Sequence, residues 1–380
     1  HPSFMANCPD ERFISNLIEL NKRADVDPEI IDLVAAYARL CLKDGKELNF
    51  YKEYLALSTN KPTIQRFIEK NASLDKRSLS FLVSYAEMMR KKRLPFLFNR
   101  AHLAIFLGTK EGEIEAIIQN KESYYHTFFI PKRNGDERRI TAPKDRLKEI
   151  QKTILRKILE KVSVHFAARG FKRRSSIISN AHGHIGQEIL VKMDIKDFFP
   201  SITYERVKGI FINLGYPEGV AEALTELTTY KGRLPMGAST SPYLSNIIAI
   251  RMDKRFTGLA KKMDFTYSRY ADDLAFSSKD GNLKRHIPFF KEIIKDEGFE
   301  VNEQKVVIAR KGGQQKVTGV VVNRKVNVEK REYKRLRAVI HNCKKGNLKT
   351  EMAKWGASNP GEYELPRSKL TGYQKNVNCC

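Results

Sequence analysis

The chain has little of the chemistry that would indicate an extracellular scaffold or a membrane protein. Its 380 residues include five cysteines and one tryptophan. The cysteines are odd in number and lack the paired spacing of zinc ligands, which argues against a disulfide framework and a zinc module. No apolar run is long enough to span a bilayer, and we find no secretory signal peptide. We therefore expect a cytoplasmic protein with reduced thiols and no membrane partner.

Acidic residues are scarce relative to basic ones. The chain carries 69 Lys and Arg against 44 Asp and Glu, which gives a formal net charge of +25. A surplus of this size favours a polyanionic partner, most simply a nucleic acid. The length allows two or three domains with cores of their own.

One pair of acids lies inside an apolar, strand-like run. Asp272 and Asp273 follow Tyr270 and Ala271 in the middle of residues 265–278. Charges in such a setting are costly unless a ligand neutralises them, and a chain reversal after Tyr270 would place them at the tip of a β-hairpin. Carboxylate oxygens suit Mg²⁺, whereas a solvated turn would explain an Asp pair that stands alone. A third carboxylate in the right setting decides between these interpretations.

Asp194 provides that third carboxylate. It follows the buried-strand pattern of residues 189–193, and residues 198–200 then end the strand. Rigid strand ends commonly present catalytic groups. With the Asp pair, Asp194 would form a site for two metal ions about 4 Å apart, which could activate a hydroxyl and stabilise a leaving pyrophosphate. The pattern therefore predicts phosphoryl transfer, which needs positioning and charge neutralisation above all.

Four motifs follow one another in a recognisable order. They are Asp194-Ile-Lys-Asp-Phe-Phe199, the segment 234–242, Tyr270-Ala-Asp-Asp273 and Asn302-Glu-Gln-Lys305. Their sequences and order resemble the palm of a reverse transcriptase. Four coincidental matches in this order are a poor explanation of the pattern.

Two further motifs narrow the resemblance. Asn180-Ala-x-x-His184 lies just ahead of the Asp194 strand, and Val317-Thr-Gly319 lies further along the chain. Both resemble signatures of bacterial retron reverse transcriptases, and the likeness extends over roughly residues 95–345. A hydrogen-bonded structural role for His184 stays as open as a contact to RNA, and Thr318 could simply be a β-branched strand residue.

The resemblance implies an α+β fold, that of a right-hand polymerase with fingers, palm and thumb, and a helical N-terminal region. The expected boundaries are residues 1–100 for the helical region, 101–185 for the fingers, 186–323 for the palm with the Asp triad, and 324–380 for a basic thumb.

The two ends of the chain carry different signals. Apolar residues recur at helical spacing in residues 10–24, 28–43 and 76–92, and this region could grip RNA or a partner protein, or pack against the polymerase body. Residues 324–354 hold eleven Lys or Arg against three acids. A helix this basic suits the phosphate backbone of a nucleic acid.

The resemblance also implies roles for individual residues. Asp194, Asp272 and Asp273 would hold two Mg²⁺ ions, with the backbone carbonyl of Ile195 as a further ligand. The residues expected at the incoming nucleotide are Lys132, Arg139, Phe199, Met236, Gly237 and Lys305. The residues expected at RNA are Asn180, His184, Val317, Thr318, Gly319, Arg331 and Arg335.

Several of these assignments have a structural alternative. Asn134-Gly135 predicts a tight hairpin between two basic strands, which could hold a triphosphate or be only a basic surface. Phe199 is the candidate steric gate against a ribose 2′-OH, or it belongs to the core as we expect for Phe198. Lys305 could approach phosphates or be a plain surface lysine. Arg269 could contact nucleic acid or pair with an acid.

Met236 departs from the family pattern, since these enzymes commonly have Gln at this position. A thioether cannot make the hydrogen bonds of an amide. We expect nucleotide selectivity or fidelity to differ as a result. Incorporation kinetics of Met236→Gln measure this effect, and unchanged misinsertion rates and Michaelis constants would contradict it.

The expected function is that of a retron RNA-directed DNA polymerase. Such an enzyme uses dNTPs to copy a cognate structured noncoding RNA into branched, RNA-linked single-stranded DNA (msDNA), primed by the 2′-OH of an internal guanosine. Many act with an effector protein in antiphage defence. The alternatives are another defence-associated reverse transcriptase without 2′-OH branching and a non-enzymatic RNA-binding scaffold.

Overall fold

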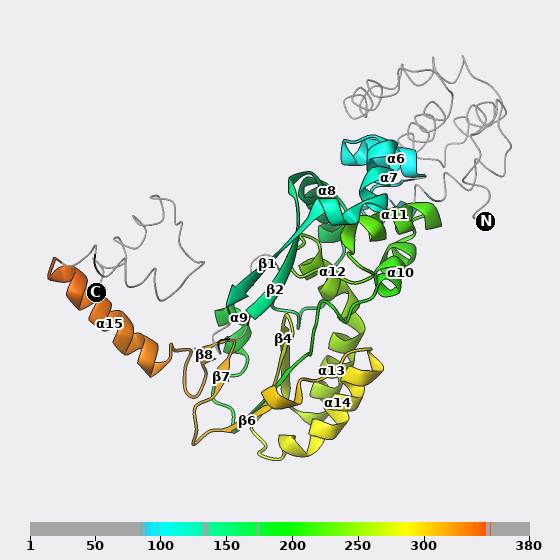
Figure 1. Ribbon diagram of the computed structural model, residues 1–380. Helices are drawn as coiled ribbons and strands as arrows, with labels where there is room; N and C mark the ends of the chain where they lie inside the picture. The colour runs from blue at the N-terminus through cyan, green and yellow to red at the C-terminus, as the bar shows by residue number, and fades with distance from the viewer. Residues whose placement is uncertain are drawn as a thin grey trace, which may run out of the picture.

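The chain combines helices with short antiparallel sheets, so the expected α+β class is confirmed (Figure 1). The computed structural model describes residues 91–346 except 98, 132–134, 136, 173 and 174, together with residues 85, 88, 89 and 350. The helices expected at residues 10–24 and 28–43, and most of the one at 76–92, lie outside the described residues.

A four-stranded antiparallel sheet lies at the centre, with strand order β4-β5-β3-β6. Its strands are β3 (Ile189–Asp194), β4 (Thr266–Tyr270), β5 (Asp273–Ser278) and β6 (Val307–Arg310). Side chains alternate between the two faces of a strand. Accordingly, Ile189, Val191 and Met193 belong to the main hydrophobic core, whereas Leu190 packs into a smaller cluster with Val317.

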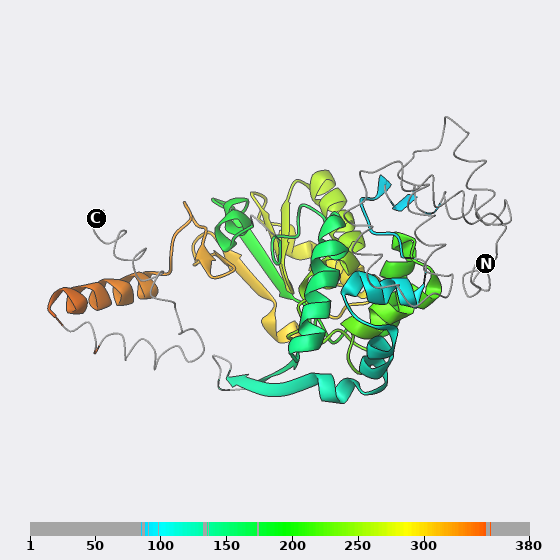
Figure 2. The same ribbon diagram turned by 90° about the horizontal axis from the view of Figure 1, so that it is seen from above.

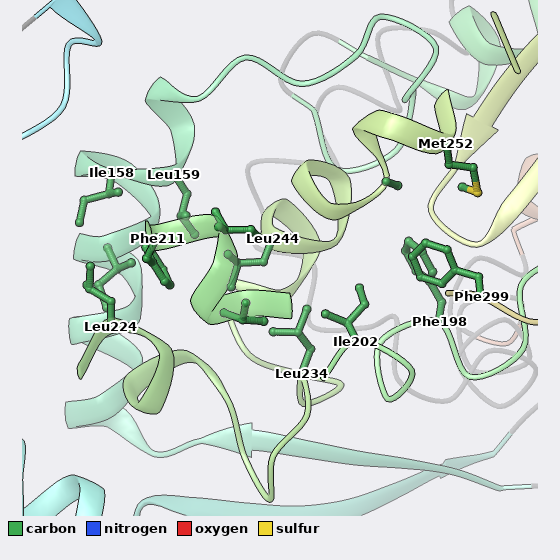
Figure 3. Packing of buried hydrophobic residues seen from close by; sticks show 14 of the residues in the cluster. Ile158, Leu159, Phe198, Ile202, Phe211, Leu224, Leu234, Leu244, Met252 and Phe299 are labelled. Atoms are coloured by element: carbon green, nitrogen blue, oxygen red, sulfur yellow. The ribbon is translucent and has the colours of Figure 1, made fainter. Parts of the chain in front are cut away.

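Helices α13 (Ile250–Met263) and α14 (Ile287–Asp296) pack against the main-core face of the sheet. Helices α10 (Tyr204–Leu214) and α12 (Ser241–Ile248) extend the same core. Phe256 of α13 and Phe290 of α14 both contact Phe276 of β5, at centroid distances of 5.0 and 4.4 Å. Figure 3 shows the core continuing from Phe198 and Phe299 through Leu244. This packing gives the strand ends of the sheet a rigid base.

A second group of helices carries a long β-hairpin. The helices are α6 (Arg100–Leu107), α7 (Glu111–Gln119), α8 (Asp145–Lys157) and α11 (Glu218–Thr228). The hairpin consists of β1 (Tyr125–Pro131) and β2 (Glu137–Pro143), paired antiparallel with Phe129 opposite Arg139. The hairpin expected around Asn134-Gly135 is therefore confirmed. It extends beside the body of the molecule, separate from the central sheet (Figure 2).

The elements α9 (Ile177–His182), β7 (Lys316–Val317) and β8 (Val320–Val321) pack on the other face of the sheet, and α15 (Lys330–Lys344) lies beyond them. Short 3₁₀ turns connect the elements of the main body: η2 (Lys121–Tyr124), η3 (Leu159–Lys161), η4 (Leu283–His286) and η5 (Glu303–Lys305). Helix α15 projects away from the body in both views (Figures 1 and 2). None of the helices in the described part of the chain is both long and apolar enough to cross a membrane.

Candidate active site

The Asp pair lies where β4 turns into β5, as the sequence predicted. Tyr270 and Asp273 are register partners, so Ala271 and Asp272 form a two-residue connection. Ala271 has a φ of 57°, in the left-handed region that costs a residue with a Cβ about 1–2 kcal/mol. Contacts around this connection must therefore hold it in place, and with it both aspartates.

Asp194 meets the pair from the neighbouring strand. It is the register partner of Asp273 across β3 and β5, and the Ile195 N–H donates to the Asp272 carbonyl at 3.0 Å. The side chains of register partners lie on the same face of a sheet and close together. The three aspartates predicted from separate motifs thus converge at one end of the central sheet.

These carboxylates repel one another. Burial raises the pKa of Asp272, its own N–H opposes this effect, and the charges of Asp194 and Asp273 raise the pKa further. Burial also raises the pKa of Asp273, opposed by Lys192 and reinforced by Asp194. Asp194 is only 8% exposed. A cluster of partly buried, mutually repelling acids favours a cation.

Lys305 supplies one positive charge to the cluster. Its Nζ forms an ion pair with Asp194 Oδ1 at 2.8 Å, and this contact raises the pKa of Lys305. The Asn302 N–H also donates to the Asp194 carbonyl at 2.8 Å, so the Asn-x-x-Lys motif is attached to the strand that carries the acid. Lys305 is thus held beside the acids, although 58% of its side chain is exposed.

The donor set fits a divalent metal ion. As the described side chains stand, no group of three or more His, Cys, Asp or Glu residues is arranged to hold a metal ion. The acids nevertheless supply the hard oxygen ligands that Mg²⁺ prefers. The N–H and C=O of one extended residue point the same way, so the Ile195 carbonyl faces the side on which its N–H meets Asp272. A bound cation would compete with Lys305 for Asp194 Oδ1.

The segment 234–242 packs against strand β2 of the hairpin. The Thr141 N–H of β2 donates to the Met236 carbonyl at 2.8 Å. Gly237 has a φ of 131°, and a Cβ there would lie 2.9 Å from both Ile140 Cγ2 and the Thr141 carbonyl oxygen. This glycine is thus required for the close approach of the segment to β2.

We expect Gly237→Ala to destabilise the protein by about 1–3 kcal/mol, because the left-handed backbone and the contact with β2 both oppose a Cβ. If β2 presents Arg139 to the nucleotide, the Michaelis constant for dNTPs rises as well. Thermal unfolding and single-nucleotide kinetics measure both effects. Gly209→Ala in α10 is the control, since a Cβ there meets nothing within 4 Å. Equal behaviour of the two variants would contradict the prediction.

The other residues expected at the nucleotide are only partly placed. Arg139 lies on β2 with its side chain exposed, whereas Lys132 lies outside the described residues. Phe199 is half-buried at the edge of the core, with ring centroids 5.6 Å from Phe198 and 5.9 Å from Phe171. Phe198 is 4% exposed, so its expected place in the core is confirmed.

The two motifs typical of retron enzymes are in contact with each other. The Asn180 amide nitrogen lies 3.5 Å from Thr318 Oγ1, and that hydroxyl lies 3.4 Å from the Ile177 carbonyl oxygen. Thr318 and Gly319 form a turn with φ values of 48° and 81°, and Val317 is buried. The motifs are 138 positions apart in the chain yet form one structural unit.

His184 is part of the interior. It is 1% exposed, and its ring nitrogens lie 2.7 Å from Ser277 Oγ and 2.8 Å from Ser268 Oγ. Burial lowers its pKa to about 4, so the ring is neutral at pH 7. This geometry favours the structural alternative over a direct contact between His184 and RNA.

Helix α15 carries the basic residues expected at RNA. Arg331 is exposed, and Arg335 lies 3.9 Å from Glu332 in an i,i+3 ion pair. Tyr333 and Leu336 are also exposed on this helix.

Sequence reasoning missed an internal group of polar residues behind the Asp turn. Arg269 pairs with Asp253, and both side chains are fully buried. Of the two roles that the sequence left open for Arg269, the pairing with an acid is therefore confirmed. The available signal was Asp253 itself, a carboxylate between Met252 and Phe256 on the apolar face of α13.

Comparisons with known proteins agree with this geometry. The family model "Reverse transcriptase (RNA-dependent DNA polymerase)" matches residues 130–355. The Retron Mx65 reverse transcriptase of Myxococcus xanthus is 38% identical over 288 residues, covering 70% of this chain and 67% of that protein. The Retron Mx162 enzyme of the same organism is 38% identical over 299 residues, covering 68% and 62%. This chain thus spans about two thirds of the length of these two relatives.

A third relative is covered more fully. The Retron Ec86 reverse transcriptase of Escherichia coli is 34% identical over 259 residues, covering 67% of this chain and 80% of that protein. Among solved structures, telomerase from Candida albicans gives a TM-score of 0.41 at 12% identity, covering 81% of this chain and 61% of that one, a likeness too weak to carry an argument. The family model and the relatives show that this chain belongs to the reverse transcriptases, and among them to the retron reverse transcriptases.

Proposed function

We propose that this chain copies a cognate structured RNA into branched, RNA-linked single-stranded DNA, primed by the 2′-OH of an internal guanosine. The observation that carries the proposal is the convergence of Asp194, Asp272 and Asp273 beside Lys305. The contact between Asn180 and Thr318 supports the retron part of the proposal, because it joins the two motifs that distinguish retron enzymes from other reverse transcriptases.

The three aspartates, with the Ile195 carbonyl, would hold two Mg²⁺ ions. When bound, these ions lower the pKa of the attacking hydroxyl and neutralise the leaving pyrophosphate. Lys305 partly neutralises Asp194 through their ion pair, and with Asp194 bound to a cation it would be available to the phosphates. Its ammonium group is also a suitable proton donor to the leaving pyrophosphate.

The central sheet and its helices correspond to the palm, residues 186–323. We assign the β1–β2 hairpin to the fingers, residues 101–185, and propose that Arg139 and Lys132 bind the triphosphate of a dNTP. Met236 and Gly237 join the hairpin to the palm. Phe199 closes the space below the sugar and excludes a ribose 2′-OH.

We assign residues 324–380 to the thumb, and α15 within it would lie along the template. RNA helices are recognised through backbone, 2′-OH groups and shape rather than through their narrow major groove. The projecting basic helix, with Arg331 and Arg335, suits such a contact. The turn at Thr318 and Gly319 is a second contact to RNA. We further propose that the complex acts with an effector protein in antiphage defence.

The test is the nucleic acid that co-purifies with the protein when it is expressed with its flanking genomic DNA. The matched control is the Asp272→Ala/Asp273→Ala variant. We expect a discrete single-stranded DNA joined to RNA through a debranching-sensitive 2′–5′ linkage, and its absence from the variant. DNA without that linkage would assign the chain to another class of defence reverse transcriptase. RNA alone in both preparations would contradict the proposed DNA synthesis.

A further inference from the structure

The largest fully buried side chain of the described residues lies directly behind the Asp turn. Arg269 is 0% exposed. Its Nε and Nη2 donate to the two carboxylate oxygens of Asp253 at 2.9 and 2.7 Å. Its Nη1 donates to Asn246 Oδ1 at 3.1 Å and to the Ala271 carbonyl at 3.0 Å. The guanidinium thus joins helices α12 and α13 to the connection that carries Asp272.

The segment before α9 closes the other side of the turn. The Asn246 amide nitrogen donates to the Gly170 carbonyl at 2.9 Å. Main-chain hydrogen bonds also run from Arg169 to Arg269 at 2.7 Å and from Arg269 to Ala167 at 2.9 Å. A Cβ on Gly170 would lie 2.7 Å from the Ala271 nitrogen. Gly170 therefore packs against the turn more closely than any other residue type could.

This arrangement counters two forces that act on the turn. Ala271 has left-handed backbone, which is unfavourable for an alanine. The charges of Asp194 and Asp273 also repel Asp272 when all three are ionised. A single buried ion pair often adds little net stability compared with apolar residues of the same volume. The bonds of Arg269 to Ala271 and Asn246 indicate that the Arg269–Asp253 pair holds the turn in one geometry.

We propose that Gly170, Asn246 and Arg269 are positioning residues that set the distance of Asp272 and Asp273 from Asp194. The proposal rests on the proposed function of the three aspartates. None of the three positioning residues needs to touch substrate. Gly170 and Arg269 contact Ala271 directly, and Asn246 acts through its hydrogen bonds to both of them. Phosphoryl transfer is sensitive to such placement, since a misplacement of about 1 Å costs about a hundredfold in rate.

Gly170→Ala is the sharpest test, because it adds one methyl group behind the turn and removes no hydrogen-bonding group. We expect kcat for nucleotide incorporation to fall about 10- to 100-fold, while KM for the nucleotide changes little. The Mg²⁺ concentration for half-maximal rate rises in the same variant. Gly258→Ala in α13 is the control, since a Cβ there meets nothing within 4 Å, and it keeps the parent kcat.

A second pair of variants separates positioning from stability. Asn246→Ala removes bonds to Gly170 and Arg269. Tyr267→Phe removes the 2.7 Å bond that the Tyr267 hydroxyl donates to Asp253 and its contact with Arg269, but leaves the bonds of Arg269 to Asn246 and Ala271 in place. Both should lower the melting temperature. Only Asn246→Ala should lower kcat for the folded fraction, measured by active-site titration.

Three results would overturn the proposal. The first is a Gly170→Ala protein with the kcat and the Mg²⁺ dependence of the parent. The second is an equal loss of kcat in Asn246→Ala and Tyr267→Phe. The third is a loss of activity in these variants that the unfolded fraction of protein explains by itself. If Gly170→Ala does not fold, the second pair decides. Asp272→Asn separates failure of the positioning proposal from failure of the proposed function. An active Asp272→Asn protein contradicts the catalytic role of the turn itself. An inactive Asp272→Asn protein together with a fully active Gly170→Ala protein contradicts only the positioning.

Discussion

Asp272→Asn is expected to lower the rate of nucleotide incorporation by about a thousandfold, equivalent to about 4 kcal/mol of transition-state stabilisation. Asn keeps the shape of the side chain but loses the charge that binds a metal ion. The rate is measured as single-nucleotide extension of a primed RNA template at saturating Mg²⁺. Asp280→Asn is the control, because Asp280 lies exposed on the loop after β5 and Asn can still accept the hydrogen bond from Asn282.

The same variant should be at least as stable as the parent in EDTA at pH 7. Burial and the charge of Asp194 raise the pKa of Asp272 in the folded state. A carboxyl group whose pKa is raised by folding stabilises the folded protein below its unfolded pKa. This contribution is lost as the pH rises through the folded pKa, so the ionised carboxylate opposes folding at neutral pH. Asn removes that effect.

Thermal unfolding checks this expectation, and the effect of Mg²⁺ on the melting temperature gives a second readout. Added Mg²⁺ should raise the melting temperature of the parent, since it binds the folded state, and should do so less for the variant. An active Asp272→Asn protein would contradict the catalytic assignment. An inactive variant that melts well below the parent in EDTA would show instead that Asp272 stabilises the fold.

Phe198→Ala and Phe199→Ala should give opposite results although the residues are adjacent. Phe198 is buried in the core, 5.5 Å from the Phe299 ring, so its truncation costs about 3–5 kcal/mol of stability (Figure 3). Phe199 lies at the edge of that core and is expected below the sugar of the nucleotide. Its truncation should cost less stability and weaken discrimination against ribonucleotides by about a hundredfold.

Each variant is the control for the other. The comparison needs kcat/KM for matched deoxy- and ribonucleotides, measured below the melting temperature of the less stable protein. Unchanged discrimination in Phe199→Ala would show that this ring belongs to the core alone. Lost discrimination in Phe198→Ala would show that the selectivity depends on packing beneath the site rather than on one ring.

The sequence by itself determined the features that depend on neighbouring residues. The run 265–278 contained an acid pair at a chain reversal, and Asn134-Gly135 indicated a hairpin between basic strands. The strand before Asp194 was recognisable because its apolar residues form an unbroken run. Signals of this kind depend on local backbone preference and on burial of one segment, and they led to the Asp triad and to the family.

Only the tertiary structure decided which distant residues meet. Lys305 contacts Asp194 across 111 positions, and Asn180 approaches Thr318 across 138. His184 could have faced RNA or the interior, and its two serine partners lie on different strands of the sheet. Arg269 could have paired with nucleic acid or with an acid until its burial against Asp253 was known. Such pairings depend on how the sheet and helices pack, because burial makes an unpaired charge or polar group costly and so selects its partner.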